Sequence, residues 1–83
     1  MKSRAEISSH VVDLMSRMFE IDPADLGEDA QLYDDLDIDS IDAVDLIVEL
    51  KNYTGKKVSP DEFKSVRSVG DVIDAVEELL RNE

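Results

Sequence analysis

Hydrophobic residues recur at helical spacing in three separate stretches of the chain. The first stretch starts near Ser3, which has capping-box spacing to Glu6. It ends at Asp22-Pro23, because the residue before a proline is pushed away from the α region. Its apolar stripe consists of Ile7, Val11, Leu14, Met15 and Met18. This pattern predicts an amphipathic helix with one side on a core.

Two further helices are predicted in the second half of the chain. One runs from Ser40 to about Tyr53, with Gly55 as its stop signal. The other opens at Ser68 and Asp71 and continues to the C-terminus. The apolar stripe of this last helix consists of Val69, Val72, Ile73, Val76 and Leu80.

The segments between these helices predict shorter elements. Residues 20–39 form a long connection whose scattered aliphatic residues are expected to cross the bundle, with a turn from Asp22 to about Leu26. Ser59-Pro60-Asp61-Glu62 combines a serine cap, an early proline and a glutamate, which predicts a short third helix. No segment has a strand pattern. The predicted fold is therefore all-α: a single domain, 1–83, forming a four-helix bundle with three longer helices and one short third helix.

The net charge of the chain limits the classes of partner that it can bind. It has 21 acidic and 9 basic residues, a net charge of -12 and no cysteine. This charge disfavours nucleic acid and anionic membrane surfaces and attracts basic protein surfaces. Without cysteine there are no disulfides and no thiolate metal sites. No apolar run is long enough for a signal peptide or a membrane span, so we expect a cytoplasmic protein without membrane insertion. We also expect a monomer.

Acidic side chains gather on one face of the helix that starts at Ser40. At about 100° per residue, four carboxylates fall within about a third of the helical wheel. No basic residue relieves their repulsion between Asp34 and Glu49. The four are Asp39, Asp42, Asp45 and Glu49. Such a face predicts a contact with a basic partner.

An aliphatic strip borders this acidic face. It consists of Ile41, Val44 and Val48, while the side around Ala43, Leu46, Ile47 and Leu50 is expected to face the core. The apolar arc of the helix is therefore wider than burial on one side requires. An aliphatic strip beside an acidic one is what a basic-rimmed docking groove recognises.

Ser40 stands at the start of this helix. Helix N-termini expose unpaired N–H groups and a partial positive charge, so a phosphodiester attached there would be favourably placed. Capping serines are common, however, so the residues alone favour Asp39 or Ser40 as an ordinary N-cap. A resemblance to a known family changes this weighting. Asp39-Ser40-Ile41 resembles the Asp-Ser-Leu motif of acyl carrier proteins, in which the serine hydroxyl receives 4'-phosphopantetheine.

The resemblance extends over roughly residues 4 to 81. Asp35-Leu36 resembles the Asp-Leu pair before the motif, and residues 42–46 resemble the acidic, aliphatic helix after it. It implies that a phosphopantetheinyl transferase modifies Ser40 and that acyl-transferring and chain-elongating enzymes dock through basic patches. The implied partner-binding residues are Asp39, Ile41, Asp42, Asp45, Val48 and Glu49, and the implied lining of an acyl-chain pocket is Leu46, Ile47 and Val66.

The sequence departs from the family pattern at several positions. Asp37 stands where glycine is common, which adds charge and removes flexibility just before the motif. Ile41 replaces the usual leucine, and Lys51 and Asn52 stand where many fatty-acid carriers have acidic residues. The carrier role is unaffected, but the cargo stays open between fatty-acid, polyketide and other specialised lipid pathways.

Other functions fit the sequence less well. The spacing of Asp35, Asp37 and Asp39 resembles the opening of an EF-hand loop, but Ser40 and Leu46 occupy the positions that need Gly and Glu, so no dedicated metal site is predicted. The single histidine, His10, is predicted on the exposed side of the first helix, so no catalytic residue is assigned.

The strongest alternative is an acidic helical interaction module without a prosthetic group. It explains the charge but not the serine at the helix start. A peptidyl carrier of the same family is closer in kind, and the strong negative charge favours the acyl type.

Overall fold

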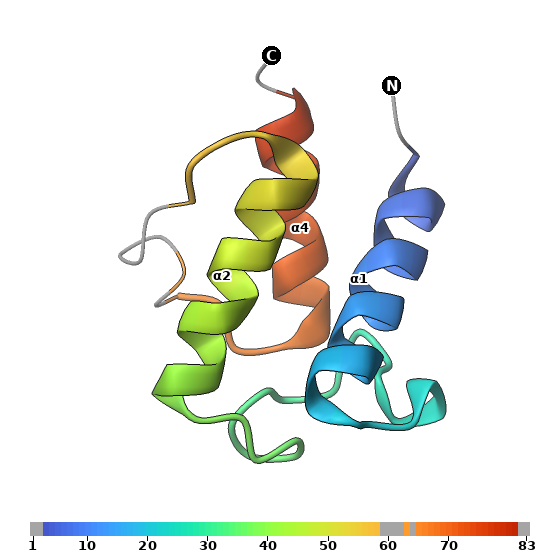
Figure 1. Cartoon of the computed structure of the whole chain (residues 1–83). Coiled ribbons are helices and arrows are strands. Elements are labelled where there is room, and N and C mark those ends of the chain that lie inside the picture. The colour runs from blue at the N-terminus through green and yellow to red at the C-terminus, as the bar shows by residue number, and fades with distance from the viewer. Residues whose placement is uncertain (1–2, 59–62, 64, 82–83) are drawn as a thin grey trace.

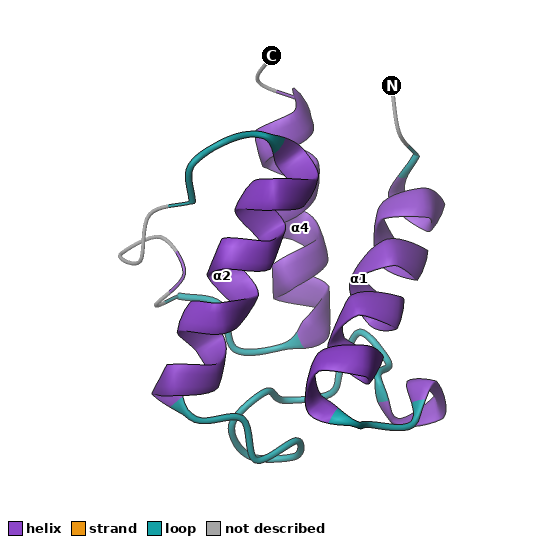
Figure 2. Ribbon diagram, in the orientation of Figure 1, coloured by secondary structure: helices purple, strands orange, loops and turns teal. Residues whose placement is uncertain are grey.

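The computed structural model describes residues 3–58, 63 and 65–81. Within these ranges the chain forms three α-helices and one short 3-10 helix, and its single β-bridge joins Gln31 and Ser68 (Figure 2). The helices are α1 (Arg4–Phe19), η1 (Pro23–Asp25), α2 (Ser40–Thr54) and α4 (Val69–Arg81). The all-α class is confirmed. The start signal of the predicted short third helix, residues 59–62, lies outside the described residues.

The three long helices run side by side (Figure 1). α1 runs opposite to α2 and α4, and the connection between α1 and α2 crosses one end of the bundle. The start of α2 lies at that crossed end, whereas the end of α2 lies at the opposite end of the bundle, where α1 begins and α4 ends. No helix in the described ranges is long and apolar enough to cross a membrane.

Local capping signals set most helix boundaries. The Ser3 hydroxyl accepts a hydrogen bond from the N–H of Glu6 at 3.2 Å, as predicted. Asp22 caps η1 through the N–H of Ala24, which confirms the turn that follows it. α1 ends earlier than the Asp22-Pro23 signal predicts, because Glu20 adopts a left-handed conformation with φ 55° and closes the helix.

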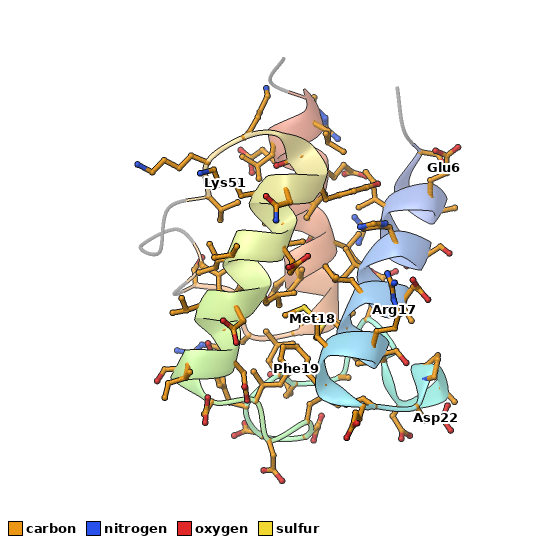
Figure 3. All side chains as sticks on the ribbon, in the orientation of Figure 1. Glu6, Arg17, Met18, Phe19, Asp22 and Lys51 are labelled. Carbon is orange, nitrogen blue, oxygen red and sulfur yellow. The ribbon has the colours of Figure 1, made fainter. Side chains whose placement is uncertain are left out.

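The predicted apolar stripes form one core. Buried side chains come from all three long helices and from the 20–39 connection. They include Ile7, Val11, Leu14 and Met15 of α1; Leu26, Leu32 and Ile38 of the connection; Ala43, Leu46 and Leu50 of α2; and Val69, Val72, Ile73 and Val76 of α4. Met18 is only half-buried and, with Phe19, lies on the side of α1 that faces α2 (Figure 3).

The long connection is also fixed by backbone hydrogen bonds that the sequence did not predict. The N–H of Leu32 donates to the Arg67 carbonyl at 2.8 Å, and the N–H of Gly70 donates to the Glu28 carbonyl at 2.9 Å. Arg4 adds ion pairs to Glu28 at 2.7 Å and to Asp74 at 2.6 Å. These hydrogen bonds, to Glu28 first and then to Asp74, raise the pKa of Arg4 above its ordinary value. The connection is thereby held against the start of α4.

Candidate functional site at the start of α2

The start of α2 is capped by Asp39 and not by Ser40. One carboxylate oxygen of Asp39 accepts hydrogen bonds from the N–H groups of Ile41 at 3.0 Å and Asp42 at 2.9 Å. The Asp42 carboxylate accepts in return from the N–H of Asp39 at 3.4 Å, which completes a capping box. Asp39 is therefore the N-cap, and Ser40 is the first helical residue.

The hydroxyl of Ser40 has no structural task among the described residues. Ser40 is exposed, and none of the hydrogen bonds in the described part of the chain involves its side chain. A hydroxyl on a fixed helix start, open to solvent, suits covalent attachment by an external enzyme. These features of Ser40 fit a phosphopantetheine arm joined through a phosphodiester.

The helix N-terminus would stabilise the negative charge of such a phosphodiester less than the sequence suggests. Asp39 already uses two of the first three N–H groups of α2, which leaves the N–H of Ser40. The Asp39 and Asp42 carboxylates also place negative charge at this end. The fold therefore offers a phosphodiester at Ser40 an accessible position more than an anion-binding site.

Asp37 holds the chain in an uncommon conformation just before this site. Its φ of 54° lies in the left-handed region, where glycine is the usual residue and aspartate is among the more tolerant alternatives. The next residue, Ile38, is buried, and its N–H donates to the Leu32 carbonyl at 3.0 Å. The conformation at Asp37 thus lets Ile38 enter the core immediately before Asp39 caps α2.

The outward face of α2 is unusually apolar. Ile41, Val44 and Val48 are 73%, 56% and 50% exposed, and they are three of the four exposed large hydrophobic residues in the described part of the chain. The fourth is Tyr33 of the connection. The expected aliphatic strip is therefore present at the surface, opposite the buried side of the helix.

The acidic residues of α2 divide into two groups. Asp39 and Asp42 take part in the capping box, whereas Asp45 and Glu49 are exposed and form no ion pair with any described residue. No group of three acidic or histidine side chains within the described ranges is arranged to hold a metal ion. Asp45 and Glu49 are thus charged side chains without a partner in the described fold.

The residues predicted for the acyl-chain pocket do not line one described cavity. Leu46 is fully buried in the core, Ile47 is half-buried, and Val66 is buried. Val66 lines an open cleft of about 430 Å³, together with Val58, Phe63, Ala75 and Leu79 among others. Neither Leu46 nor Ile47 belongs to the described lining of that cleft.

His10 is not the exposed residue that the sequence predicts. It is half-buried, and its ring stacks on Tyr53 with centroids 3.6 Å apart and planes 11° from parallel. The prediction was wrong because helical periodicity does not reveal which side chain a neighbouring helix presents. Tyr53 is 13 residues beyond Ser40, about 20 Å along α2, so this pair is remote from the candidate site.

Comparisons with known proteins identify relatives of this chain. Residues 9–76 match the family model described as a phosphopantetheine attachment site. Acyl carrier protein 2 of Ralstonia nicotianae is 49% identical over 78 residues, which cover 94% of this chain and 96% of that protein. The acyl carrier protein of Thermotoga maritima is 36% identical over 80 residues, covering 96% and 99%. The solved structure of an acyl carrier protein from Enterococcus faecalis aligns with a TM-score of 0.74 at 26% identity, covering 99% and 100%.

Proposed function

Because this chain belongs to the acyl carrier protein family, whose members hold 4'-phosphopantetheine covalently on a serine, we propose that Ser40 is the attachment residue. The chain is a carrier and not an enzyme. The observation that carries the proposal is the cap: Asp39 fixes the helix start, so the exposed Ser40 hydroxyl is left without a structural task.

Loading is a phosphoryl-group transfer to Ser40. A phosphopantetheinyl transferase takes the hydroxyl proton, the serine oxygen bonds to the pantetheine-linked phosphorus of coenzyme A, and the pyrophosphate bond to that phosphorus breaks. Adenosine 3',5'-bisphosphate leaves. Once bound, the arm supplies a terminal thiol that carries the acyl group as a thioester. The protein contributes a rigid, accessible helix start.

We propose that partner enzymes dock on the outward face of α2. These partners are acyl-transferring and chain-elongating enzymes with basic patches, of a fatty-acid, polyketide or other specialised lipid pathway. Asp45 and Glu49 form no internal ion pair in the described fold and so are available to basic side chains. The other predicted contacts are Asp39, Ile41, Asp42 and Val48. We add Val44 to them, because its side chain is also exposed.

The remaining predictions concern the acyl-chain contacts, the domain organisation, the oligomeric state and the location of the protein. We propose that the acyl chain contacts Leu46, Ile47 and Val66; the half-buried position of Ile47 and the cleft beside Val66 support two of the three. A single 1–83 domain, a monomer and a cytoplasmic location also stay predictions.

Intact mass tests the attachment residue. The folded chain is incubated with coenzyme A and a broad-specificity phosphopantetheinyl transferase, beside Ser40→Ala and the matched variant Ser9→Ala, which changes an exposed serine of α1. We expect one phosphopantetheinyl group on wild type and Ser9→Ala and none on Ser40→Ala. An unmodified wild type with an active transferase would instead support the interaction module without a prosthetic group.

A further inference from the structure

Three lysines at the far end of α2 have no acidic partner in the described fold. Lys51 lies in the last turn of the helix, and Lys56 and Lys57 follow its C-cap. None of the three forms an ion pair with a described residue. By contrast, three of the four described arginines, Arg4, Arg17 and Arg81, form ion pairs with described residues, and Arg67 does not. Unpaired cations grouped at one end are unexpected in a chain with a net charge of -12.

The turn that carries Lys56 and Lys57 is held in place. The hydroxyl of buried Thr54 lies 2.9 Å from the Leu50 carbonyl and accepts a hydrogen bond from the N–H of Lys56 at 3.1 Å. Gly55 takes the left-handed conformation with φ 71°. Val58 is buried at the other end of the turn. The backbone under these lysines is therefore fixed in the folded chain.

Lys51 extends the outward face of α2 on the side away from the acids. At about 100° per residue, Lys51 lies about 20° from Val44 and about 60° from Val48 around the helix, but about 160° from Glu49. The aliphatic strip is thus flanked by carboxylates along one edge and by Lys51 at its far end. Figure 3 places Lys51 at the end of α2 that is distant from the helix start.

We propose that Lys51, Lys56 and Lys57 form a second docking contact that selects partner enzymes with an acidic group beyond their basic patch. The proposal rests on the proposed use of α2 as the docking face. Lys51 lies six residues after Asp45, about 9 Å along the helix, so the acidic group of the partner lies about that far from the basic residue that meets Asp45. Because these lysines have no described internal partner, the new ion pairs break none.

A helix dipole accounts for only part of this arrangement. Lys51 in the last turn interacts favourably with the negative end of α2. Lys56 and Lys57 lie beyond the helix, where that effect falls away. The helix dipole therefore gives no role to Lys56 and Lys57, whereas a docking contact would give them one.

Two synthetic helical peptides test the proposal. Both carry a leucine strip flanked by arginines; six residues beyond an arginine, one has two glutamates and the other two glutamines. Binding to the chain is measured by fluorescence anisotropy at low salt. We expect wild type to bind the glutamate peptide about 3- to 10-fold more tightly, since each exposed ion pair contributes modestly.

Matched variants assign the effect to the lysines. K51Q/K56Q/K57Q should lose the preference, whereas R17Q/R67Q/R81Q, which removes the same charge elsewhere, should keep it. Equal binding of both peptides by wild type, or a preference that survives in the lysine variant or disappears in the arginine variant, would overturn the proposal. Thermal melts verify folding. The transferase reaction on the same samples tests Ser40 separately. A chain that prefers the glutamate peptide but gains no phosphopantetheinyl group would refute the attachment site and leave the lysine contact standing.

Discussion

The serines at the starts of α2 and α4 show how one local motif serves two purposes. Both helices begin with a capping box. At α4 the cap is Ser68, whose hydroxyl accepts from the N–H of Asp71 at 3.1 Å, while the Asp71 carboxylate accepts from the N–H of Ser68 at 3.3 Å. At α2 Asp39 is the cap, and Ser40 comes one residue later. This shift by one position leaves the Ser40 hydroxyl exposed and unengaged among the described residues.

The same two helices differ in where their apolar side chains lie. In α4 the side chains of Val69, Val72, Ile73 and Val76 are fully buried, and no large hydrophobic residue of that helix is exposed. In α2 the aliphatic strip faces solvent. The difference indicates that α4 mainly stabilises the fold, whereas α2 combines a core face with an exposed aliphatic strip, as the proposed docking surface requires.

The largest expected effect comes from one substitution made in both helices. Ile73→Ala in α4 should lower the free energy of unfolding by about 3 kcal/mol, because it leaves a cavity in the core. Ile41→Ala in α2 should change it by less than about 0.5 kcal/mol, because that side chain is already in water. Urea unfolding of both variants measures the contrast, and similar losses would show that the α2 strip is part of the core.

The two serines should differ by a smaller amount. Ser68→Ala removes a cap and should destabilise the protein by about 1 kcal/mol. Ser40→Ala removes no hydrogen bond of the described fold and should leave the stability within about 0.5 kcal/mol of wild type. Thermal melts of the unmodified proteins measure both values. A clear loss for Ser40→Ala would give its hydroxyl a structural role and weaken the comparison.

The entry into α2 should also respond to backbone chemistry at Asp37. Asp37→Gly should be more stable than Asp37→Ala by about 0.5 kcal/mol, because alanine is disfavoured at a positive φ. Asp34, which does not have a positive φ, is the matched position, and there alanine should be the more stable of the two. Equal stabilities of the two Asp37 variants would argue against the left-handed conformation.

The smallest expected effect concerns charge on α2. Asp45→Asn should raise the free energy of unfolding by about 0.3 kcal/mol, because Asp42 and Glu49 lie three and four residues away on the same face. Added salt or Mg²⁺ should raise the melting temperature of wild type more than that of the variant. A melting temperature that does not change across the salt titration would show that repulsion between these carboxylates does not destabilise the fold.

Local signals in the sequence predicted most of the fold. These signals act over a few neighbouring residues, so a single sequence is enough to recognise them. They are the caps at Ser3, Asp22 and Ser68, the stop at Gly55 and the apolar stripes. Features that depend on distant segments were missed. The hydrogen bond between Leu32 and Arg67 and the stack of His10 on Tyr53 exist only once the helices have packed.

The candidate site divides in the same way. The acidic face and the aliphatic strip of α2 follow from helical periodicity, and the structure places the strip at the surface. The sequence could not decide whether Asp39 or Ser40 caps the helix, because both residue types cap well. Only the hydrogen bonds from Ile41 and Asp42 to the Asp39 carboxylate settle that choice.

The most direct test of the central claim is to locate the arm by residue. The loaded chain is digested, and tandem mass spectrometry identifies which of its eight serines carries the phosphopantetheinyl group. We predict a single modified residue, Ser40. An arm on any other serine would contradict the conclusion that the hydroxyl left free behind the Asp39 cap is the attachment site.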